Sequence, residues 1–432
     1  MAQDYQTTEE FWGFFHSFLL LLERYYVPLT KVSNRPFTLP VRIRIIEGRK
    51  RYLFRRYGPQ SRKFKKASAH LARFVHRYMC SLEEEFLENN DRTKLYTFVR
   101  RKFNAYRQIP DLTTAAGPAV SDREKSEVFA GHFKSVFTVD NGILPPIQPL
   151  TDVELSEADF TQLAVRKAIM SLAPKLTRGP DQLPAFFYRQ LCNPISFPLT
   201  LLFQKSLHEG VLPSVWRQAV VVPVFKKGSR AEPTNYRPIA KQCTALKVME
   251  KAVMASVVSH VEGLGLLSER QFGFRSGRSV TQQLLFSLTA WSQHFSSPVY
   301  VTFLDLMKAF DKVSHEKIIH KLSAYGINDP LLSWFRAYFH GRIQRVQVGC
   351  EYSSFYDVTS SINQGSCAGP LLFILFINDI VSVIPAGVEI GMFADDCTLF
   401  SRDAELLQKA LDNVQDGLTF GNFLFQLENA FL

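Results

Sequence analysis

Three aspartates have the residue type and spacing best suited to chemistry in this chain. Asp305 ends the apolar, β-branched run 299–305, which predicts a strand with a carboxylate at its exit. Asp395 and Asp396 lie side by side between two short apolar runs, which predicts a hairpin with the acids at its turn. An isolated Asp-Asp pair is usually a solvated turn, but the matching third acid favours a metal site. Because Mg²⁺ prefers carboxylates together with substrate phosphates, we expect a two-ion site for phosphoryl transfer.

The elements that would position these acids occupy the chain from about residue 151 onward. The residue patterns predict a helix over 197–209, a strand over 219–225 and one helix over 308–325. A strand ending in an acid, then helices, then an acidic hairpin favour an α+β fold with an antiparallel sheet backed by helices. This order resembles the palm of a nucleic-acid polymerase.

The basic surplus of the chain lies entirely in residues 1–110, which are helical in pattern. The net charge is +11, and this region holds 22 Lys and Arg against 10 Asp and Glu, whereas the remainder holds 29 against 30. Basic residues are densest in Arg42–Lys66, where Tyr and Phe lie between them. Such interleaving suits a phosphate backbone and unstacked bases; the alternative is a solvated helix face. Residues 111–150, richer in Pro and Gly, are interpreted as a linker around one short helical stretch near 122–137.

Cysteine usage and hydropathy bear on where the protein works. The six cysteines are scattered without a Cys-x-x-Cys pair, which predicts neither a zinc site nor a disulfide framework and fits an intracellular setting, nucleus or cytoplasm. The apolar run Phe11–Leu22 is too short to span a bilayer, so no membrane partner is expected. Thr7 and Glu10 form a capping-box pattern, which favours an amphipathic or buried helix there.

Several further segments, taken in order with the acids, carry a family resemblance. They are Pro223–Gly228 with Asn235–Ile239, Gln271–Ser279, Phe303–His315, Asn363–Ile380 and Phe393–Asp396. In this order and spacing they strongly resemble the reverse transcriptase of non-LTR retrotransposons (long interspersed elements). The likeness covers roughly residues 160–432 and extends more weakly into the basic N-terminal part.

The resemblance implies a fold and an extent. We expect polymerase fingers and palm over residues 151–432, with the core motifs in 206–432, after the basic helical N-terminal region. Leu418–Leu427 resembles the family's next motif in outline. No thumb and no endonuclease are expected, which indicates a fragment of an element-encoded polymerase.

The resemblance also assigns the catalytic centre. It implies that Asp305, Asp395 and Asp396 are catalytic and bind two Mg²⁺ ions, with the backbone carbonyl of Leu306 as a further ligand. One ion would activate the primer 3′-hydroxyl, and the other would neutralise the triphosphate and the leaving pyrophosphate.

A second set of residues is expected to bind the incoming nucleotide. The set implied by the resemblance is Lys226, Arg237, Phe310, Gln364 and Gly365. Arg offers a bidentate fork to phosphate and Lys a point charge; Lys227 is an alternative to Lys226. The Phe310 ring would exclude a ribose 2′-hydroxyl, although it could also be a plain core residue. Gly365 would allow close backbone approach.

The basic loop at the end of the segment Gln271–Ser279 is expected to contact nucleic acid. Arg275 and Arg278, with Gly277 between them, suit template phosphates. Asp311 and His315 also lie inside motifs and are expected to have structural roles, as is Asp379.

The leading hypothesis is an RNA-directed DNA polymerase that uses an RNA template, a DNA primer, dNTPs and Mg²⁺. The alternative is a catalytically inactive RNA- or DNA-binding remnant of such an element. An intron-encoded maturase or an RNA-directed RNA polymerase fits the motifs Gln364–Phe373 and Phe393–Asp396 less well.

Overall fold

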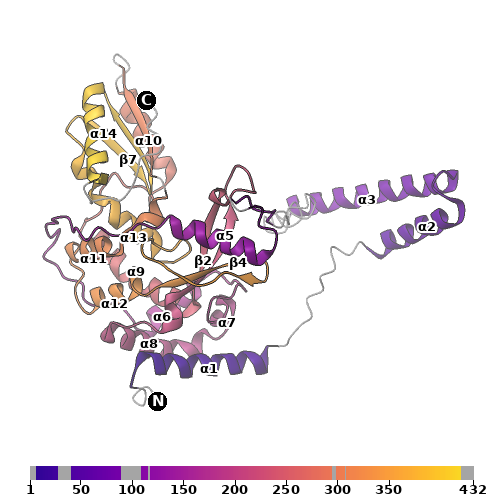
Figure 1. Cartoon of the computed structure of the whole chain (residues 1–432), viewed down its shortest axis with the longest axis horizontal. Helices are drawn as coiled ribbons and strands as arrows, with labels where there is room; N and C mark the ends of the chain where they lie inside the picture. The colour runs from indigo at the N-terminus through magenta and orange to yellow at the C-terminus, as the bar shows by residue number, and fades with distance from the viewer. Residues whose placement is uncertain are drawn as a thin grey trace. The chain divides into compact units, whose positions relative to one another are not determined.

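The computed structural model describes residues 6–27, 40–88, 109–114, 117–293, 298–306 and 308–419. The chain divides into two compact units, which are described separately (Figure 1). The first unit comprises residues 1–23 and 109–432, and the second comprises residues 24–108. The segment 420–427, which carries most of the expected last motif, lies outside the described residues.

The first unit mixes helices with two sheets, which confirms an α+β class. Its helices are α1 (Thr8–Tyr26), α5 (Asp122–Ser135), α6 (Gln162–Ser171), α7 (Ala185–Gln190), α8 (Cys192–Glu209), α9 (Thr244–Gly263), α10 (Val280–Ser292), α11 (His315–Ala324), α12 (Leu331–Phe339), α13 (Gly369–Ile377) and α14 (Ala404–Thr419). Short 3-10 helices are η1 (Ser214–Arg217), η2 (Pro233–Asn235), η3 (Ala309–Lys312) and η4 (Asn378–Val383). The strands are β1 (Gln218–Phe225), β2 (Tyr236–Lys241), β3 (Tyr300–Asp305), β4 (Ile343–Val348), β5 (Glu351–Tyr352), β6 (Tyr356–Asp357), β7 (Val388–Phe393) and β8 (Asp396–Ser401).

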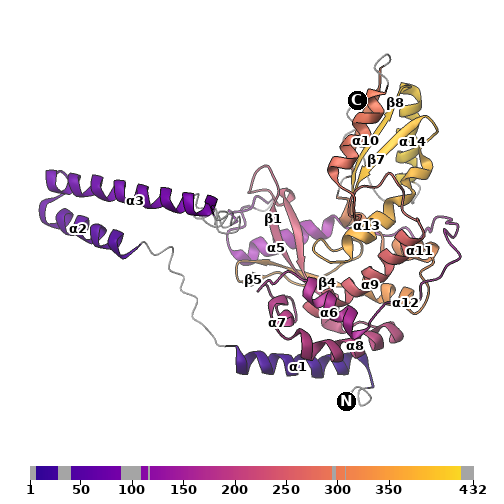
Figure 2. The same ribbon diagram turned by 180° about the vertical axis from the view of Figure 1, so that it is seen from behind.

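The strands form one mixed and one antiparallel sheet. The larger sheet has the order β2-β1-β4-β5, with β6 also paired to β4; β1 and β4 are parallel and the other pairs are antiparallel. The smaller sheet has the order β3-β8-β7 and is antiparallel throughout. Helices α10 and α14 pack against this smaller sheet (Figure 2). Asp305 and Asp396, with Asp395 in the adjoining turn, therefore lie in an antiparallel sheet that is covered by helices, as predicted.

Helix α1 is amphipathic and packs into the main core of the first unit. The predicted capping box is present: Glu10 N donates to Thr7 Oγ1 at 3.2 Å, and Thr7 N donates to Glu10 Oε2 at 3.3 Å. The buried Trp12 ring meets Trp216 edge-on, with centroids 5.1 Å apart. Within the described residues, no helix is long and apolar enough to cross a membrane.

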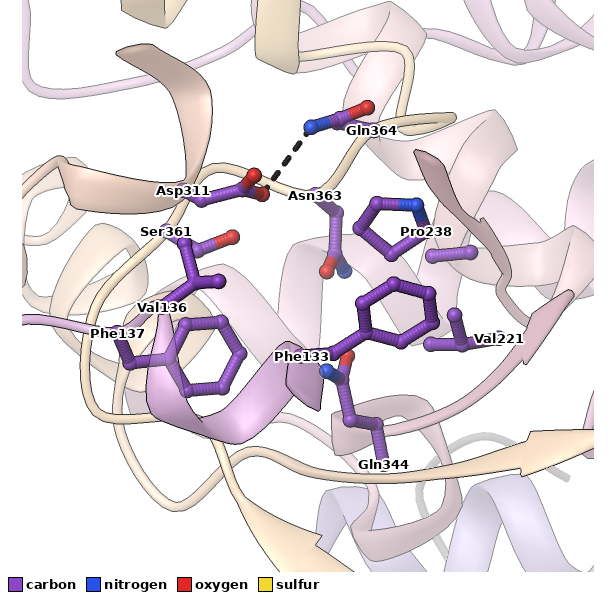
Figure 3. Close-up of a pocket in the computed structure, with 11 residues that line it drawn as sticks. Phe133, Val136, Phe137, Val221, Pro238, Asp311, Gln344, Ser361, Asn363 and Gln364 are labelled. Atoms are coloured by element: carbon purple, nitrogen blue, oxygen red, sulfur yellow. Dashed lines mark hydrogen bonds between the residues drawn. The ribbon is translucent and has the colours of Figure 1, made fainter. Parts of the chain in front are cut away.

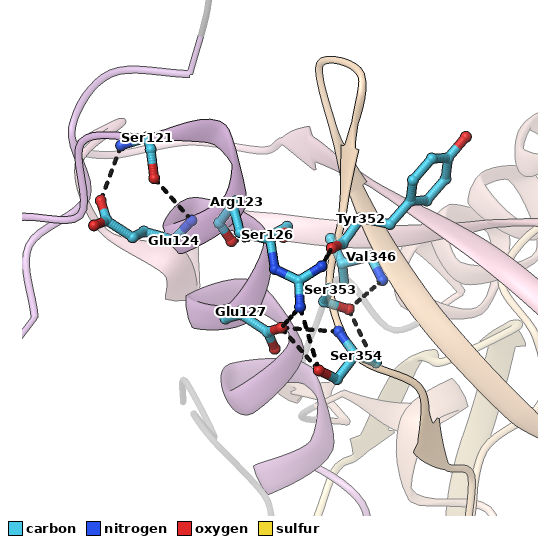
Figure 4. Close-up of polar contacts among 9 residues, drawn as sticks. All are labelled: Ser121, Arg123, Glu124, Ser126, Glu127, Val346, Tyr352, Ser353 and Ser354. Atoms are coloured by element: carbon cyan, nitrogen blue, oxygen red, sulfur yellow. Dashed lines mark hydrogen bonds and ion pairs between the residues drawn. The ribbon is translucent and has the colours of Figure 1, made fainter.

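Helix α5 lies inside the segment that the sequence suggested as a linker. It has a capping box at Ser121 and Glu124, and its buried Phe129 and Phe133 pack against the larger sheet. Arg123 and Glu127 extend from this helix to the polar turn after β5, where Glu127 accepts a hydrogen bond from Ser354 N at 2.9 Å (Figure 4). This packing makes α5 an integral part of the fold.

The prediction of one continuous helix over 308–325 is wrong, because the structure has two separate helices there. Helix η3 ends at Lys312, and α11 starts at His315 after the N-cap Ser314, whose hydroxyl accepts from Lys317 N at 3.2 Å. Ser caps satisfy the free amides of a new helix start. The apolar spacing continues across the break, so periodicity alone gave a single helix.

The second unit is a pair of helices, α2 (Val41–Tyr57) and α3 (Arg62–Glu88). The chain turns between them at Gly58, which has φ +73°. Apart from the buried Ile43, the described side chains of α2 are exposed or half-buried, with Tyr52, Phe54 and Tyr57 among the exposed ones. This surface keeps its basic and aromatic side chains open to solvent.

Candidate active site

The three acids meet at one end of the smaller sheet. Asp305, the last residue of β3, is the direct cross-strand partner of Asp396, the first residue of β8. Asp395 lies in the two-residue turn before it, next to Ala394, which has φ +57°. Two strands and one tight turn therefore bring together three carboxylates separated by 90 residues of sequence. The hairpin and the strand exit are both confirmed.

The acids perturb one another electrostatically. Burial raises the pKa of Asp395, and the charges of Asp396 and Asp305 raise it further, whereas Arg237 lowers it. Burial also raises the pKa of Asp396; Asp305 adds to this effect and Lys226 opposes it. Burial and the neighbouring carboxylates thus both disfavour the ionised acids, and a bound cation would favour them.

The donor chemistry of this cluster suits a hard cation. Its side-chain donors are carboxylate oxygens, which is the ligand type that Mg²⁺ prefers. Among the described residues, however, no three His, Cys, Asp or Glu side chains stand in metal-binding geometry. A site that takes two carboxylates and completes its coordination with substrate phosphates needs no such preformed cage.

A segment 120 residues upstream holds the acidic turn in place. Phe272 N donates to Met392 O, and Met392 N donates to Arg270 O, both at 2.8 Å, so the segment runs parallel beside β7. The buried Gln271 Oε1 accepts from Ala394 N at 3.0 Å and from its near neighbour, Gly273 N, at 2.8 Å. Residues 270–273 thus contact both the strand and the turn that carry the acids.

Two basic residues of the β1–β2 hairpin affect the pKa values of the acids. Lys226 follows β1, and Arg237 lies on β2 opposite Val224, so both come from one hairpin. Both side chains are exposed. Since Lys226 acts on Asp396 and Arg237 on Asp395 electrostatically, the hairpin places positive charge near the carboxylates.

The Gln364–Gly365 loop packs against the end of β2. Ala240 N donates to Gln364 O at 2.8 Å, and Gly365 has φ +119°. A Cβ on Gly365 would lie 2.7 Å from Ala240 O, so only glycine allows this approach. The Gln364 side chain donates to Asp311 Oδ1 at 3.1 Å (Figure 3). Gly365 thus approaches the backbone of β2 closely, whereas its expected contact with a nucleotide stays a prediction.

Beneath Gln364 lies a small cavity bordered by Asp311, Pro238 and Phe133 (Figure 3). Its volume of about 20 Å³ suffices for one water molecule and not for a nucleotide. Burial raises the pKa of Asp311 to about 6, and the Gln364 hydrogen bond opposes this shift. The Asp311 side chain therefore holds the Gln364–Gly365 loop through its hydrogen bond with Gln364.

Phe310 is half-buried at the start of η3, five residues after Asp305. Its ring stacks on the buried Phe373 with centroids 4.4 Å apart and meets Phe274 edge-on at 6.5 Å. The contacts with Phe373 and Phe274 fix the position of the Phe310 ring. The expected exclusion of a ribose 2′-hydroxyl by this ring stays a prediction.

The two arginines of the basic loop are already engaged. Arg275 donates to Glu262 at 2.9 and 2.5 Å and to Ser268 O at 2.8 Å, and its side chain is 6% exposed. Arg278 pairs with Glu269 and is 21% exposed. A template phosphate would therefore have to open the Arg275 ion pair, whereas Arg278 is more accessible.

A buried carboxylate that sequence reasoning missed holds the loop before α13. Glu250 Oε2 accepts from Cys367 N at 2.6 Å and Ala368 N at 3.3 Å, and its Oε1 accepts from Tyr338 at 3.0 Å and Gln242 at 3.1 Å. Burial raises its pKa, and the hydrogen bonds oppose that shift. The available signal was an acid placed among the apolar positions Leu246, Met249 and Val253 of the same helix. Gln271 lies within a segment that carries the resemblance, and the sequence alone assigns it no role.

A groove runs from the acids along α10. Its volume is about 500 Å³, and its walls include Asp305 and Asp396 together with the apolar Leu284, Leu288 and Phe303. These three apolar side chains are more than half exposed. The acids therefore open onto a surface large enough for part of a polymeric substrate.

Comparisons with known proteins agree with this geometry. Residues 224–427, which contain all three acids, match the family model described as reverse transcriptase (RNA-dependent DNA polymerase). The chain is 27% identical over 322 residues to the probable RNA-directed DNA polymerase from transposon X-element of Drosophila melanogaster, covering 68% of this chain and 34% of the relative. It is 26% identical over 345 residues to the corresponding protein of transposon BS from the same organism, covering 74% and 37%.

A third relative is the RNA-directed DNA polymerase from mobile element jockey of Drosophila funebris, 25% identical over 327 residues, with 70% and 35% covered. The chain thus spans about a third of the length of these relatives. The fold, the acidic hairpin and the matched region make residues 224–427 similar to the reverse transcriptase family. The relatives are RNA-directed DNA polymerases of a transposon or a mobile element, which confirms the resemblance to non-LTR retrotransposons seen in the sequence.

Proposed function

We propose that this chain extends a DNA primer on an RNA template, as the polymerase part of a non-LTR retrotransposon protein. The observation that carries the proposal is the direct pairing of Asp305 with Asp396, beside Asp395, within the matched region. In this proposal the sheet β3-β8-β7 is the palm, and the β1–β2 hairpin belongs to the fingers.

Asp305, Asp395 and Asp396 would hold two Mg²⁺ ions, with the Leu306 carbonyl as a further ligand. When bound, these ions supply a lowered pKa of the primer 3′-hydroxyl and charge neutralisation of the pyrophosphate. The raised pKa values of Asp395 and Asp396 support this role, because burial and then the neighbouring carboxylates disfavour the ionised forms, and bound cations would offset that cost.

The remaining residues would orient the substrates. Lys226 and Arg237 bind the triphosphate, a proposal supported by their electrostatic effect on the acids. The Phe310 ring blocks a ribose 2′-hydroxyl. Gln364 and Gly365 border the nucleotide, with their backbone fixed by Ala240. Arg278 contacts a template phosphate, and Arg275 does so only if its ion pair opens.

The experiment is primer extension on oligo(dT)-primed poly(rA), with the same primer on poly(dA) as the template comparison. The Asp395→Asn variant keeps the shape and removes a metal ligand, so extension should fall to background. Asp412→Asn, an exposed acid on α14, is the matched control and should extend at the parent rate. Extension by Asp395→Asn at the parent rate would place the catalytic centre elsewhere. RNA binding without any extension by the parent would favour the inactive remnant.

A further inference from the structure

We infer that Gln271 is a positioning residue for Asp395, acting through the amide of Ala394. The inference rests on the proposed function and concerns a residue to which the resemblance assigns no role. Gln271 is 1% exposed, and one oxygen of its side chain accepts from both Ala394 N and Gly273 N. This oxygen links the upstream segment directly to the turn that carries the acid.

The turn needs external support because of its backbone. Ala394 has φ +57°, a left-handed conformation that L-residues other than Asn, Asp and Gly adopt rarely. Residues in such regions persist when their surroundings over-determine them. The hydrogen bond from Ala394 N to Gln271 is such a constraint, and it acts one residue before Asp395.

The upstream segment is itself held rigidly against the hairpin. Its main chain forms two hydrogen bonds with Met392, one to the carbonyl and one from the amide, each 2.8 Å long. Gly273 packs so close that a Cβ there would overlap Ala394 N and lie 2.9 Å from the carbonyl carbon of Phe393. Gln271 therefore ties the turn to a fixed segment of backbone. Loss of this hydrogen bond would displace Asp395 relative to Asp305.

The test compares Gln271→Leu, which removes the acceptor at similar size, with Gln271→Asn, which keeps the amide on a shorter side chain. Ser401→Ala is the matched control, because the buried Ser401 holds the opposite end of the same hairpin through Gly387 O at 2.9 Å. Primer extension gives kcat and KM, and electron paramagnetic resonance of free Mn²⁺ gives metal affinity without turnover.

Both Gln271 variants should lower kcat by about 10- to 100-fold, the scale of a misplacement of about 1 Å. The KM for dTTP should change little, and Mn²⁺ affinity should fall, whereas Ser401→Ala stays within about twofold of the parent in every reading. Adding Ala394→Gly to Gln271→Leu should restore part of both losses, since glycine adopts positive φ without support.

Parent-like kcat and Mn²⁺ affinity in both Gln271 variants would overturn the inference. Equal losses in Ser401→Ala would overturn it too, because they would show general damage to the hairpin. If the parent chain itself shows no extension, the proposed function fails, while Mn²⁺ affinity still decides whether Gln271 positions Asp395. A Gln271→Leu protein that does not fold leaves the decision to Gln271→Asn.

Discussion

Asp305 and Asp396 face each other directly across the β3–β8 ladder. Like charges at directly opposed strand positions are destabilising, so this sheet carries an electrostatic cost at its end. Asp395 in the adjoining turn adds to the cost, as its raised pKa indicates. The same relationship that makes the site suitable for cations weakens the apo fold.

The first prediction concerns stability and pH. Because the folded-state pKa of Asp395 is raised above its unfolded value, ionisation of Asp395 destabilises the fold. The penalty is absent below the unfolded pKa of about 4, grows as the pH rises to the folded pKa and is constant above it. Asp395→Asn should therefore raise the thermal midpoint at pH 7 and show no gain at pH 3.

Thermal melts at both pH values, with and without Mg²⁺, measure this effect. Mg²⁺ should narrow the difference at pH 7 by stabilising the parent. Asp412→Asn should leave the midpoint unchanged at either pH. A lower midpoint for Asp395→Asn at pH 7 would contradict the assignment.

The second prediction concerns sugar selection. If Phe310 excludes the 2′-hydroxyl, Phe310→Val should raise kcat/KM for UTP relative to dTTP by about tenfold or more. Phe373→Leu removes the ring on which Phe310 stacks and is the packing control. Should both variants lose stability and leave the UTP to dTTP ratio unchanged, Phe310 would be a core residue only.

The third prediction concerns the buried carboxylate of Glu250. Its two oxygens accept four hydrogen bonds, so Glu250→Gln replaces one acceptor by a donor that faces donors. A buried polar group left unsatisfied costs about 1–3 kcal/mol, which urea unfolding can measure. Hydrogen exchange at the amides of Cys367 and Ala368 should also rise. Glu154→Gln, at an exposed acid, should change neither quantity.

The fourth prediction concerns the basic helix α2. Arg42, Arg49 and Arg56 recur every seven residues on α2, so they share one face of the helix. If each neutralises one phosphate of single-stranded RNA, their triple replacement by Gln should flatten the log–log salt slope of binding by about 2. The matched control replaces three exposed basic residues of the first unit, Arg166, Lys167 and Lys175. An equal effect of both triple variants would place the binding surface elsewhere.

Local sequence patterns were sufficient for the elements that carry the chemistry. Asp305 at the strand exit and the Asp395 hairpin could be read from short apolar runs, because strand and turn signals act over a few residues. The close approach of Gly365 followed from its residue type. The strand exit and the hairpin depend on the chain within a few positions of the residue named, whereas the residue type of Gly365 indicated only that a close approach was possible there and not that Ala240 would be its partner.

The features that the sequence did not reveal depend on partners elsewhere in the chain. The role of Gln271 needs Ala394, 123 positions away, and that of Glu250 needs Cys367, 117 positions away. Arg275 was expected to be free for phosphate, and its ion pair with Glu262 became visible only in the fold. Hydrophobic periodicity carries no information about such pairings, since it reports only which face of an element is buried.

Helix α1 packs in the first unit, although the second unit separates it in sequence from the rest of that unit. The basic helix pair is therefore an insert, joined to its host at both ends. The sequence of an insert can diverge while the fold of its host stays intact. Deletion of all residues before Ile109 would, in contrast, remove Trp12 and its contact with Trp216. The charge and shape of the insert can thus change without a change to the sheet β3-β8-β7.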